Sequence, residues 1–400
     1  MRPARARASI VTGARPAALL LPLAAACFGL PPPTALDMRL DFPGVEMLRP
    51  KWRRLVVDPE LRPYDPVERS GAAFDPGRGL VFVGTSQGRF LALDSGLGGE
   101  VWSHSETDPF NSVAVHLPEV DLVVVGNDGG HLLAFDPDDG RVAWRAALGA
   151  PIRRPVAYAD RVAYARTTAG GVFAVEAETG RELWSFSRPA PEGYKAGMDA
   201  GLLPADGRIV TGFSDGTVVA LSAVSGEKLW DINVAGEGDA EIVLDDITAT
   251  PVRIEGAIVV ASYDNGVFAV DAERGTQIWA RTDLTRVSGL AAVGGDPLVA
   301  LSGRGLARLD PADGSTVWIR RFPAGTLADP IVRDGIVVLS DDINGLVFFE
   351  ALTGEVLQAW GAGHGAAGPP AVAGGRLAFL DNAGEFRAFY FLRRWFAAPR

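Results

Sequence analysis

A repeated unit of about 40 residues is the feature that most restricts how this chain can fold. The clearest copy, residues 256–280, predicts three short strands at 257–262, 267–270 and 277–280. Asn and Gly residues stand between the first two strands, and both tolerate the positive φ that tight hairpins need. Each copy therefore reads as a small antiparallel sheet.

The unit occurs eight times, and equivalent positions of successive copies lie 39 to 49 residues apart. These positions are Ala92, Ala134, Ala174, Ala220, Ala269, Arg308, Phe348 and Ala388. Ten residues further on, the seventh copy carries Gln358 and the first six carry tryptophans, namely Trp102, Trp144, Trp184, Trp230, Trp279 and Trp318. This period, with roughly four strands per copy, is typical of a β-propeller. We therefore predict an all-β, eight-bladed β-propeller of four-stranded antiparallel blades, with the indoles packed between neighbouring blades.

The two ends of the repeat region complete each other. Residues 51–57 resemble the tryptophan-bearing strand of a unit and contain Trp52, but no unit precedes them. The eighth copy lacks this strand, since the tryptophan position is Ala398. Pairing the two ends would complete one blade and remove open sheet edges, which invite aggregation. We therefore expect a ring over residues 50–392 that is closed by an N-terminal strand.

Residues 1–27 have the composition of an export signal. A basic stretch precedes an apolar segment at 17–26, which is too short to span a bilayer as a helix. The segment ends in Leu-Ala-Ala-Ala-Cys27, which resembles the lipobox of bacterial lipoproteins, where the cysteine is acylated. The alternative is ordinary cleavage after an Ala-x-Ala site, with Cys27 incidental. In the lipoprotein interpretation, Phe28 in place of Asp implies sorting to the outer membrane.

Two further segments flank the predicted ring. Residues 28–49 contain three consecutive prolines and little periodicity, so we interpret them as a tether that reaches up to ~70 Å when extended. Residues 393–400 form a tail with basic and aromatic side chains, which we expect to pack against the ring; the alternative is contact with lipid or a partner.

Two copies are longer than the others, and both have their extra residues at the same point of the unit. The insertions, at 188–201 and 235–246, follow Trp184 and Trp230 and precede the first strand of the next copy. Equivalent points of a propeller open on one face, and the two copies are consecutive, so the insertions should be neighbours. Long loops on a rigid scaffold commonly carry binding function. The alternative is neutral variation in loop length.

Composition and motifs argue against several kinds of function. The net charge of −11, despite four arginines within residues 1–26, disfavours a nucleic-acid partner. A single cysteine allows no internal disulfide and no cysteine-cluster metal site. Ser86 and Ser214 fit the G-x-S-x-G pattern, but a strand follows each of them where a nucleophile elbow requires a helix.

Metal and cofactor sites are also disfavoured. The acidic stretch 136–140 lacks the later bidentate Glu of an EF-hand loop and matches the turns of the other copies. The four histidines show no ligand spacing, and the chain has no phosphate-binding loop or nucleotide fingerprint. We therefore expect a non-catalytic protein without metal or cofactor.

The unit, of the form Asp-Gly-x-Val-x-Ala-Leu-Asp-x-x-x-Gly-x-x-x-Trp, resembles the repeat of pyrroloquinoline-quinone-type propellers. One branch, the quinoprotein dehydrogenases, resembles this chain in the repeat only, and a single cysteine cannot form the vicinal disulfide that this branch implies. The other branch is the BamB family, the lipoprotein subunits of the outer-membrane β-barrel assembly machinery. It is similar over roughly residues 50–390, in eight repeats, a lipoprotein-like start and an early tryptophan strand.

The most specific similarity lies within the two insertions. Residues 241–251, Glu-Ile-Val-Leu-Asp-Asp-Ile-Thr-Ala-Thr-Pro, are similar to an acidic segment of the BamB family. In that family, this segment and a loop of the preceding blade bind the periplasmic domains of the barrel subunit, BamA. The resemblance implies partner-binding roles for Tyr194, Lys195, Gly197, Asp199, Glu241, Ile242, Leu244, Asp245 and Asp246.

The resemblance also implies a function. The chain would be a scaffold of the Bam complex that docks on BamA, contacts other Bam subunits and assists the insertion of β-barrel proteins. A lipid on Cys27 would anchor it to the outer membrane, facing the periplasm. Two alternatives stay open: a propeller of the same repeat family that binds another partner, or a quinone-dependent or hydrolytic enzyme.

Overall fold

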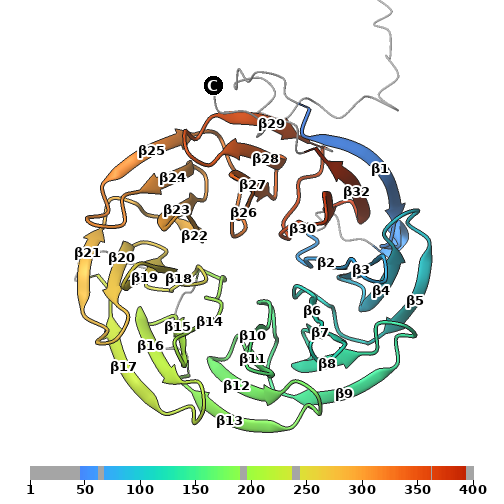
Figure 1. Cartoon of the computed structure of the whole chain (residues 1–400), viewed down its shortest axis with the longest axis horizontal. Coiled ribbons are helices and arrows are strands. Elements are labelled where there is room, and N and C mark those ends of the chain that lie inside the picture. The colour runs from blue at the N-terminus through green and yellow to red at the C-terminus, as the bar shows by residue number, and fades with distance from the viewer. Residues whose placement is uncertain (1–45, 62–66, 190–195, 237–243, 362, 393–400) are drawn as a thin grey trace, which may run out of the picture. The chain divides into compact units, whose positions relative to one another are not determined.

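The computed structural model describes residues 46–61, 67–189, 196–236, 244–361 and 363–392. Within them, 32 strands form eight four-stranded antiparallel sheets, arranged like blades around a central axis (Figure 1). The predicted eight-bladed propeller is confirmed. The described residues also contain a single turn of 3₁₀ helix, η1 (Pro59–Leu61). None of the helical structure described there is long and apolar enough to cross a membrane.

The blades follow chain order, and each blade runs from its innermost to its outermost strand. Blade 1 contains β2 (Ala73–Asp75), β3 (Leu80–Gly84), β4 (Arg89–Asp94) and β5 (Glu100–Ser105); blade 2 contains β6 (Val115–Leu117), β7 (Leu122–Gly126), β8 (His131–Phe135) and β9 (Val142–Ala147). Blade 3 contains β10 (Ala157–Ala159), β11 (Val162–Arg166), β12 (Gly171–Glu176) and β13 (Glu182–Ser187); blade 4 contains β14 (Leu203–Ala205), β15 (Arg208–Gly212), β16 (Thr217–Ser222) and β17 (Lys228–Asn233).

The second half of the ring repeats this arrangement. Blade 5 contains β18 (Val252–Ile254), β19 (Ala257–Ser262), β20 (Gly266–Asp271) and β21 (Gln277–Arg281); blade 6 contains β22 (Val287–Val293), β23 (Asp296–Leu301), β24 (Gly305–Leu309) and β25 (Thr316–Arg321). Blade 7 contains β26 (Ile331–Arg333), β27 (Ile336–Asp341), β28 (Gly345–Glu350) and β29 (Val356–Trp360). Blade 8 contains β30 (Ala371–Ala373), β31 (Arg376–Leu380), β32 (Glu385–Phe391) and, from the other end of the chain, β1 (Leu48–Leu55).

The ring closes by the pairing of its first and last strands. Strand β1 lies antiparallel to β32, with Leu48 opposite Phe391 and Leu55 opposite Glu385. This confirms the predicted closure. Strand β1 begins at Leu48, within the range 28–49 that the sequence assigns to the tether, because Met47 and Leu48 are buried against blade 7.

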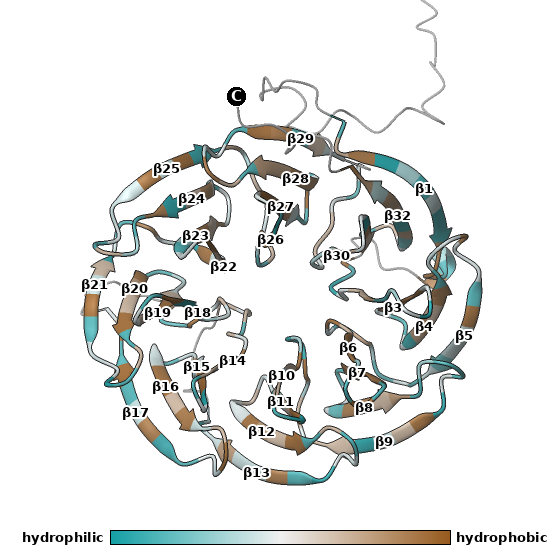
Figure 2. Ribbon diagram, viewed as in Figure 1, coloured by the Kyte–Doolittle hydropathy of each residue, from teal (hydrophilic) through white to brown (hydrophobic). Residues whose placement is uncertain are grey.

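The hydrophobic core is divided among the junctions between blades. Eight clusters of buried side chains occur in the described residues, and each is shared by two neighbouring blades. Middle strands such as β3 are buried throughout, because both faces of a blade are covered by its neighbours. Outermost strands such as β5 bury mainly their tryptophan, and Figure 2 shows that hydrophilic and hydrophobic residues are mixed along the outer strands. Most of the hydrophobic side chains are thus buried between neighbouring blades.

The tryptophans join consecutive blades in one geometry. Each indole lies against a glycine in the last turn of the following blade, where a Cβ would come within 2.5 to 2.7 Å of the ring. Each indole Nε1 also donates a hydrogen bond of 2.9 to 3.2 Å to a carbonyl of that turn. The seven tryptophans are Trp52, Trp102, Trp144, Trp184, Trp230, Trp279 and Trp318. Their predicted packing between blades is confirmed.

The junction between blades 7 and 8 is made differently, and its geometry explains the missing tryptophan. The fourth strand of blade 8 is β1, which comes from the other end of the chain, so no glycine turn leads into it. Gln358 instead accepts hydrogen bonds at Oε1 from the amides of Met47 (2.8 Å) and Leu48 (3.2 Å). This glutamine therefore binds the start of the closing strand.

Candidate partner-binding site

The two insertions lie side by side on one face of the ring. Residues 188–202 connect β13 to β14, and residues 234–251 connect β17 to β18. Because the strands of a blade alternate in direction, all connections from an outermost to an innermost strand open on the same face. The Ala196 amide donates to Asp246 Oδ2 (3.1 Å), and a Cβ on Gly201 would lie 2.4 Å from Thr250 Oγ1. The neighbouring positions predicted from the spacing are confirmed.

The acidic segment 244–246 is attached to the turn between β19 and β20. The Leu244 amide donates to Asp264 Oδ2 (3.0 Å), and the Asp264 amide donates in return to the Leu244 carbonyl (3.3 Å). Asp245 Oδ1 accepts from Asn265 Nδ2 (2.8 Å). The segment is therefore a fixed part of blade 5.

Asp246 links the two insertions. Its side chain is only 3% exposed, and its carboxylate accepts the Ala196 amide. Its own carbonyl accepts the amide of Tyr263, at the end of β19 (2.9 Å). The sequence singles out Asp246 as an acid that contacts a partner, whereas the structure gives its carboxylate an internal role.

The remaining predicted site residues fall into two groups. In the described residues, Gly197 is exposed with a φ of +72°, whereas Asp199, Leu244 and Asp245 are half-buried. Tyr194, Lys195, Glu241 and Ile242 lie outside the described residues, as do Cys27 and the predicted signal, most of the tether and the tail.

A buried arginine, Arg166 of β11, lies behind the first insertion. Its Nη1 donates to the Ala200 carbonyl (3.0 Å) and to Thr211 Oγ1 (3.2 Å), and its guanidinium carbon lies 4.9 Å from the centre of the Phe213 ring. Burial lowers the pKa of Arg166 to about 10, and the carboxylates of Asp199 and Asp246 offset part of that change. Arg166 therefore stays charged at neutral pH.

A second arginine, Arg154, connects both insertions to the opposite side of the ring. It lies in the loop that leads into blade 3 and donates to the carbonyls of Asp199, in the first insertion, and of Thr248, two residues after the second insertion. Its Nη1 also donates to Asp329 Oδ2 (2.9 Å), in the loop that leads into blade 7. Asp329 Oδ2 accepts in addition from Thr250 Oγ1 (3.1 Å). Sequence reasoning missed both arginines, because neither stands in a long loop or a motif.

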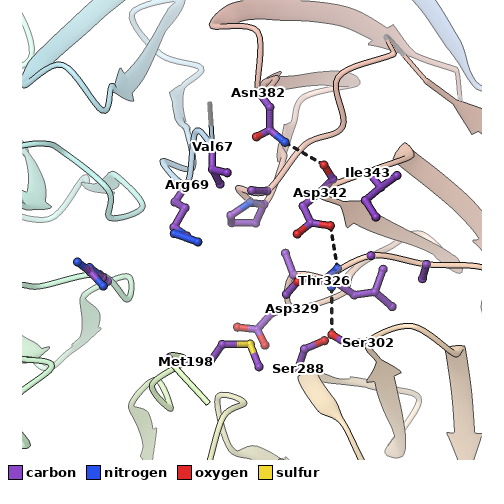
Figure 3. A pocket seen from close by; sticks show the side chains of 18 of the residues that line it. Val67, Arg69, Met198, Ser288, Ser302, Thr326, Asp329, Asp342, Ile343 and Asn382 are labelled. Carbon is purple, nitrogen blue, oxygen red and sulfur yellow. Dashed lines mark hydrogen bonds between the residues drawn. The ribbon is translucent and has the colours of Figure 1, made fainter. Parts of the chain in front are cut away.

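The first insertion also borders a central cavity of about 1180 Å³ on this face. Figure 3 shows side chains of Ser302, Asp342 and Asn382 around it, together with Met198 of the insertion. The Thr326 amide donates to Asp342 Oδ1 (2.8 Å), so this carboxylate is held by the backbone. No group of three His, Cys, Asp or Glu side chains in the described part of the chain is arranged to hold a metal.

The two G-x-S-x-G serines and the acidic stretch 136–140 all lie in turns of the repeat. Ser86 lies in the turn before β4 and Ser214 in the turn before β16, so each is followed by a strand. In the acidic stretch 136–140, Asp136 Oδ1 accepts the amide of Asp138 (3.0 Å), and Asp138 pairs with Arg78 (2.6 Å). These residues stabilise turns.

The ring and its repeat define the class of protein: a propeller of the pyrroloquinoline-quinone-like repeat type. A family model described as "Outer membrane protein assembly factor BamB" matches residues 86–296 and 267–390. The chain belongs to this family. Its relatives there are named as assembly factors and not as enzymes.

Individual relatives agree with this assignment. The BamB of Burkholderia pseudomallei is 26% identical over 320 residues, which cover 77% of this chain and 81% of that protein. The BamB of Yersinia pestis is 24% identical over 323 residues, which also cover 77% of this chain and 81% of that protein. The crystal structure of BamB from Moraxella catarrhalis superposes with a TM-score of 0.70 at 17% identity, covering 86% of this chain and all of that one.

The fold alone is shared more widely. A quinohemoprotein alcohol dehydrogenase from Pseudomonas putida superposes with a TM-score of 0.65 at 12% identity, covering 88% of this chain and 78% of that one. Assembly factors and dehydrogenases thus use one architecture, and the sequence match distinguishes between them.

Proposed function

We propose that this chain is a non-catalytic scaffold of the outer-membrane β-barrel assembly machinery. It docks on the periplasmic domains of a BamA-like barrel subunit, contacts other Bam subunits and assists the folding and insertion of β-barrel proteins. A lipid on Cys27 anchors it to the outer membrane, and the ring faces the periplasm.

The observation that carries the proposal is the joined pair of insertions. Asp246 binds the Ala196 amide, and Arg154 binds the carbonyls of Asp199 and of Thr248, which follows the second insertion, so the two loops form one surface on a rigid ring. A preorganised surface loses little conformational entropy when a partner binds. Membership of a family of outer-membrane protein assembly factors supports a partner within that assembly machinery.

The test is co-purification of the barrel subunit with variants of the second insertion. Ile242→Asp places a charge where the family resemblance implies an apolar anchor, and Asp245→Arg reverses a half-buried acid. We expect each variant to reduce recovery of the barrel subunit, by roughly 30-fold if the residue is a binding hot spot. Ile242→Asp is the more informative variant, because Asp245→Arg also removes the acceptor of Asn265 Nδ2, and Asp246→Arg would remove the acceptor of the Ala196 amide.

The matched control is Glu227→Arg. Glu227 is an exposed acid in the turn between β16 and β17, on the face of the ring opposite the insertions. It should leave recovery unchanged. Full recovery of the barrel subunit with both Ile242→Asp and Asp245→Arg would contradict docking through the insertions.

A further inference from the structure

Strand β1 differs in charge from every other outermost strand of the ring. Its eight residues contain Arg49, Lys51, Arg53 and Arg54 and no acid. The other seven outermost strands have net charges between −1 and +2. Their charged residues are Glu100 in β5, Arg145 in β9, Glu182 in β13, Lys228 and Asp231 in β17, Arg281 in β21, and Arg320 and Arg321 in β25. The chain as a whole is strongly acidic, so β1 is a local reversal of charge.

Two of these four cations form ion pairs, and the other two have no carboxylate partner within the described parts of the chain. Arg53 pairs with Glu385 (3.4 Å) and Arg54 with Glu100 (3.0 Å). Among the described residues, neither Arg49 nor Lys51 has a carboxylate partner. Because the paired cations are also partly exposed, β1 keeps a surplus of positive charge at the surface.

Arg49 and Lys51 instead flank an aromatic ring, and Lys51 Nζ also donates a hydrogen bond to the Ser95 carbonyl (3.0 Å). The guanidinium carbon of Arg49 and the Nζ of Lys51 each lie 5.1 Å from the centre of the Tyr390 ring. Tyr390 belongs to β32 and is 39% exposed. Figure 2 shows hydrophilic residues along most of β1, whereas the adjacent outermost strand β29 is mainly hydrophobic. Cations with an amphipathic aromatic side chain suit the boundary between water and a bilayer.

The place of β1 in the chain favours a membrane as its partner. It is the first strand of the ring and follows the predicted tether, whose length allows the ring to take any orientation. An anionic surface repels the acidic remainder of the ring and attracts β1, so it selects one orientation. In Figure 1, β1 lies across the ring from β14 and β18, which follow the two insertions.

We propose that the basic surface formed by Arg49, Lys51, Arg53 and Tyr390 binds the anionic headgroups of a phospholipid membrane. This contact turns blade 8 toward the bilayer and leaves the two insertions accessible on the far side of the ring. The charge argument is independent of partner docking, and only the proximity to the membrane rests on the proposed lipid on Cys27.

The three lysines of the chain provide the test. Lys51 lies in β1, Lys228 lies in β17 of blade 4, and Lys195 lies in the first insertion. The full-length protein, purified from membranes, is mixed with vesicles of phosphatidylcholine alone or of phosphatidylcholine with phosphatidylglycerol. Acetylation rates of Lys51 and Lys228 are then measured by mass spectrometry. We expect anionic vesicles to slow acetylation of Lys51 several-fold and to leave Lys228 unchanged.

Two further arms test whether charge is the cause. High salt should abolish the protection of Lys51, because it screens exposed charges. Arg49→Gln with Arg53→Gln should also abolish it, since each basic residue contributes about fivefold to binding at an anionic surface. The matched control is Arg304→Gln with Arg321→Gln, which removes two exposed arginines of blade 6. Thermal melting verifies that both double variants fold.

The outcomes separate the inference from the proposed function. If the full-length protein does not associate with neutral vesicles, this result counts against the lipid anchor. Protection of Lys51 by anionic vesicles would still support the inference in that case. Equal acetylation of Lys51 with both kinds of vesicle would overturn it. Protection of Lys51 by an acidic protein, with none by anionic vesicles, would overturn it in favour of a protein partner.

Discussion

Seven junctions of the ring and the eighth differ in how neighbouring blades are held together. In the seven, an indole lies on a glycine of the next blade and donates to a carbonyl of the same turn. In the eighth, Gln358 accepts the amides of Met47 and Leu48. The residue at this position therefore depends on what the next blade presents: a turn in seven cases, and the free start of a strand in one.

The largest effect should follow removal of an indole from a regular junction. Trp230→Ala leaves a cavity between blades 4 and 5 and deletes the hydrogen bond to the Ala272 carbonyl (3.2 Å). We expect a loss of about 3–5 kcal/mol in the free energy of unfolding, measured by urea denaturation. Trp230→Phe should lose less, because most of the volume is kept. Equal stability of Trp230→Ala and the parent would contradict the role given to these junctions.

Stability should also depend on the glycine partner of each indole, and the chain offers an adjacent control. Gly98 has a φ of +76°, and a Cβ there would lie 2.6 Å from the Trp52 ring, whereas a Cβ on Gly99 meets nothing within 4 Å. Gly98→Ala should cost more than about 1 kcal/mol, and Gly99→Ala less than that. Thermal melts of the two variants test the difference, and identical melting temperatures would disprove it.

The eighth junction should respond locally. Gln358→Ala leaves two amides at the start of β1 without their acceptor, which costs about 1–3 kcal/mol where the amides stay buried. We expect faster hydrogen exchange at Met47 and Leu48. Gln358→Trp should not restore protection, since this junction has no glycine turn to receive an indole. Unchanged exchange in Gln358→Ala would show that β1 is held by its pairing with β32 alone.

The smallest effect on global stability should come from the link between the insertions. Asp246→Asn keeps the shape of the side chain but weakens the charge-assisted hydrogen bond from the Ala196 amide, so we expect a loss of about 1 kcal/mol or less. Exchange at Ala196 should rise while the blades keep their protection. A rise throughout blade 4 would instead mean that Asp246 supports the ring itself.

Much of the fold follows from the repeat. The period predicts eight blades, and the unmatched strand at Trp52 predicts how they close. The sequence also shows that Gln358 replaces a tryptophan, but not why. The reason depends on the meeting of residues that lie 310 positions apart, Leu48 and Gln358, which no local pattern encodes.

The candidate site was predictable in position but not in its internal contacts. Insertion lengths place the two loops together, as the Asp246–Ala196 contact confirms. The two arginines that support the insertions could not be found from insertion lengths. Arg166 lies in blade 3 and Arg154 in the loop that leads into it, and both contact the insertions only because the folded ring brings these segments together. The burial of Asp246 could not be predicted from the sequence either, since acids in long loops are usually exposed.

The central functional claim is that the joined insertions, and not another part of the ring, meet the assembly machinery. Photo-cross-linking in living cells tests this most directly. The cross-linking amino acid is placed at position 245 and, as a control, at position 227 of blade 4, on the face of the ring opposite the insertions. We predict a cross-link to the barrel subunit from position 245 and none from position 227. Cross-links from position 227 alone, or from neither position, would contradict the account.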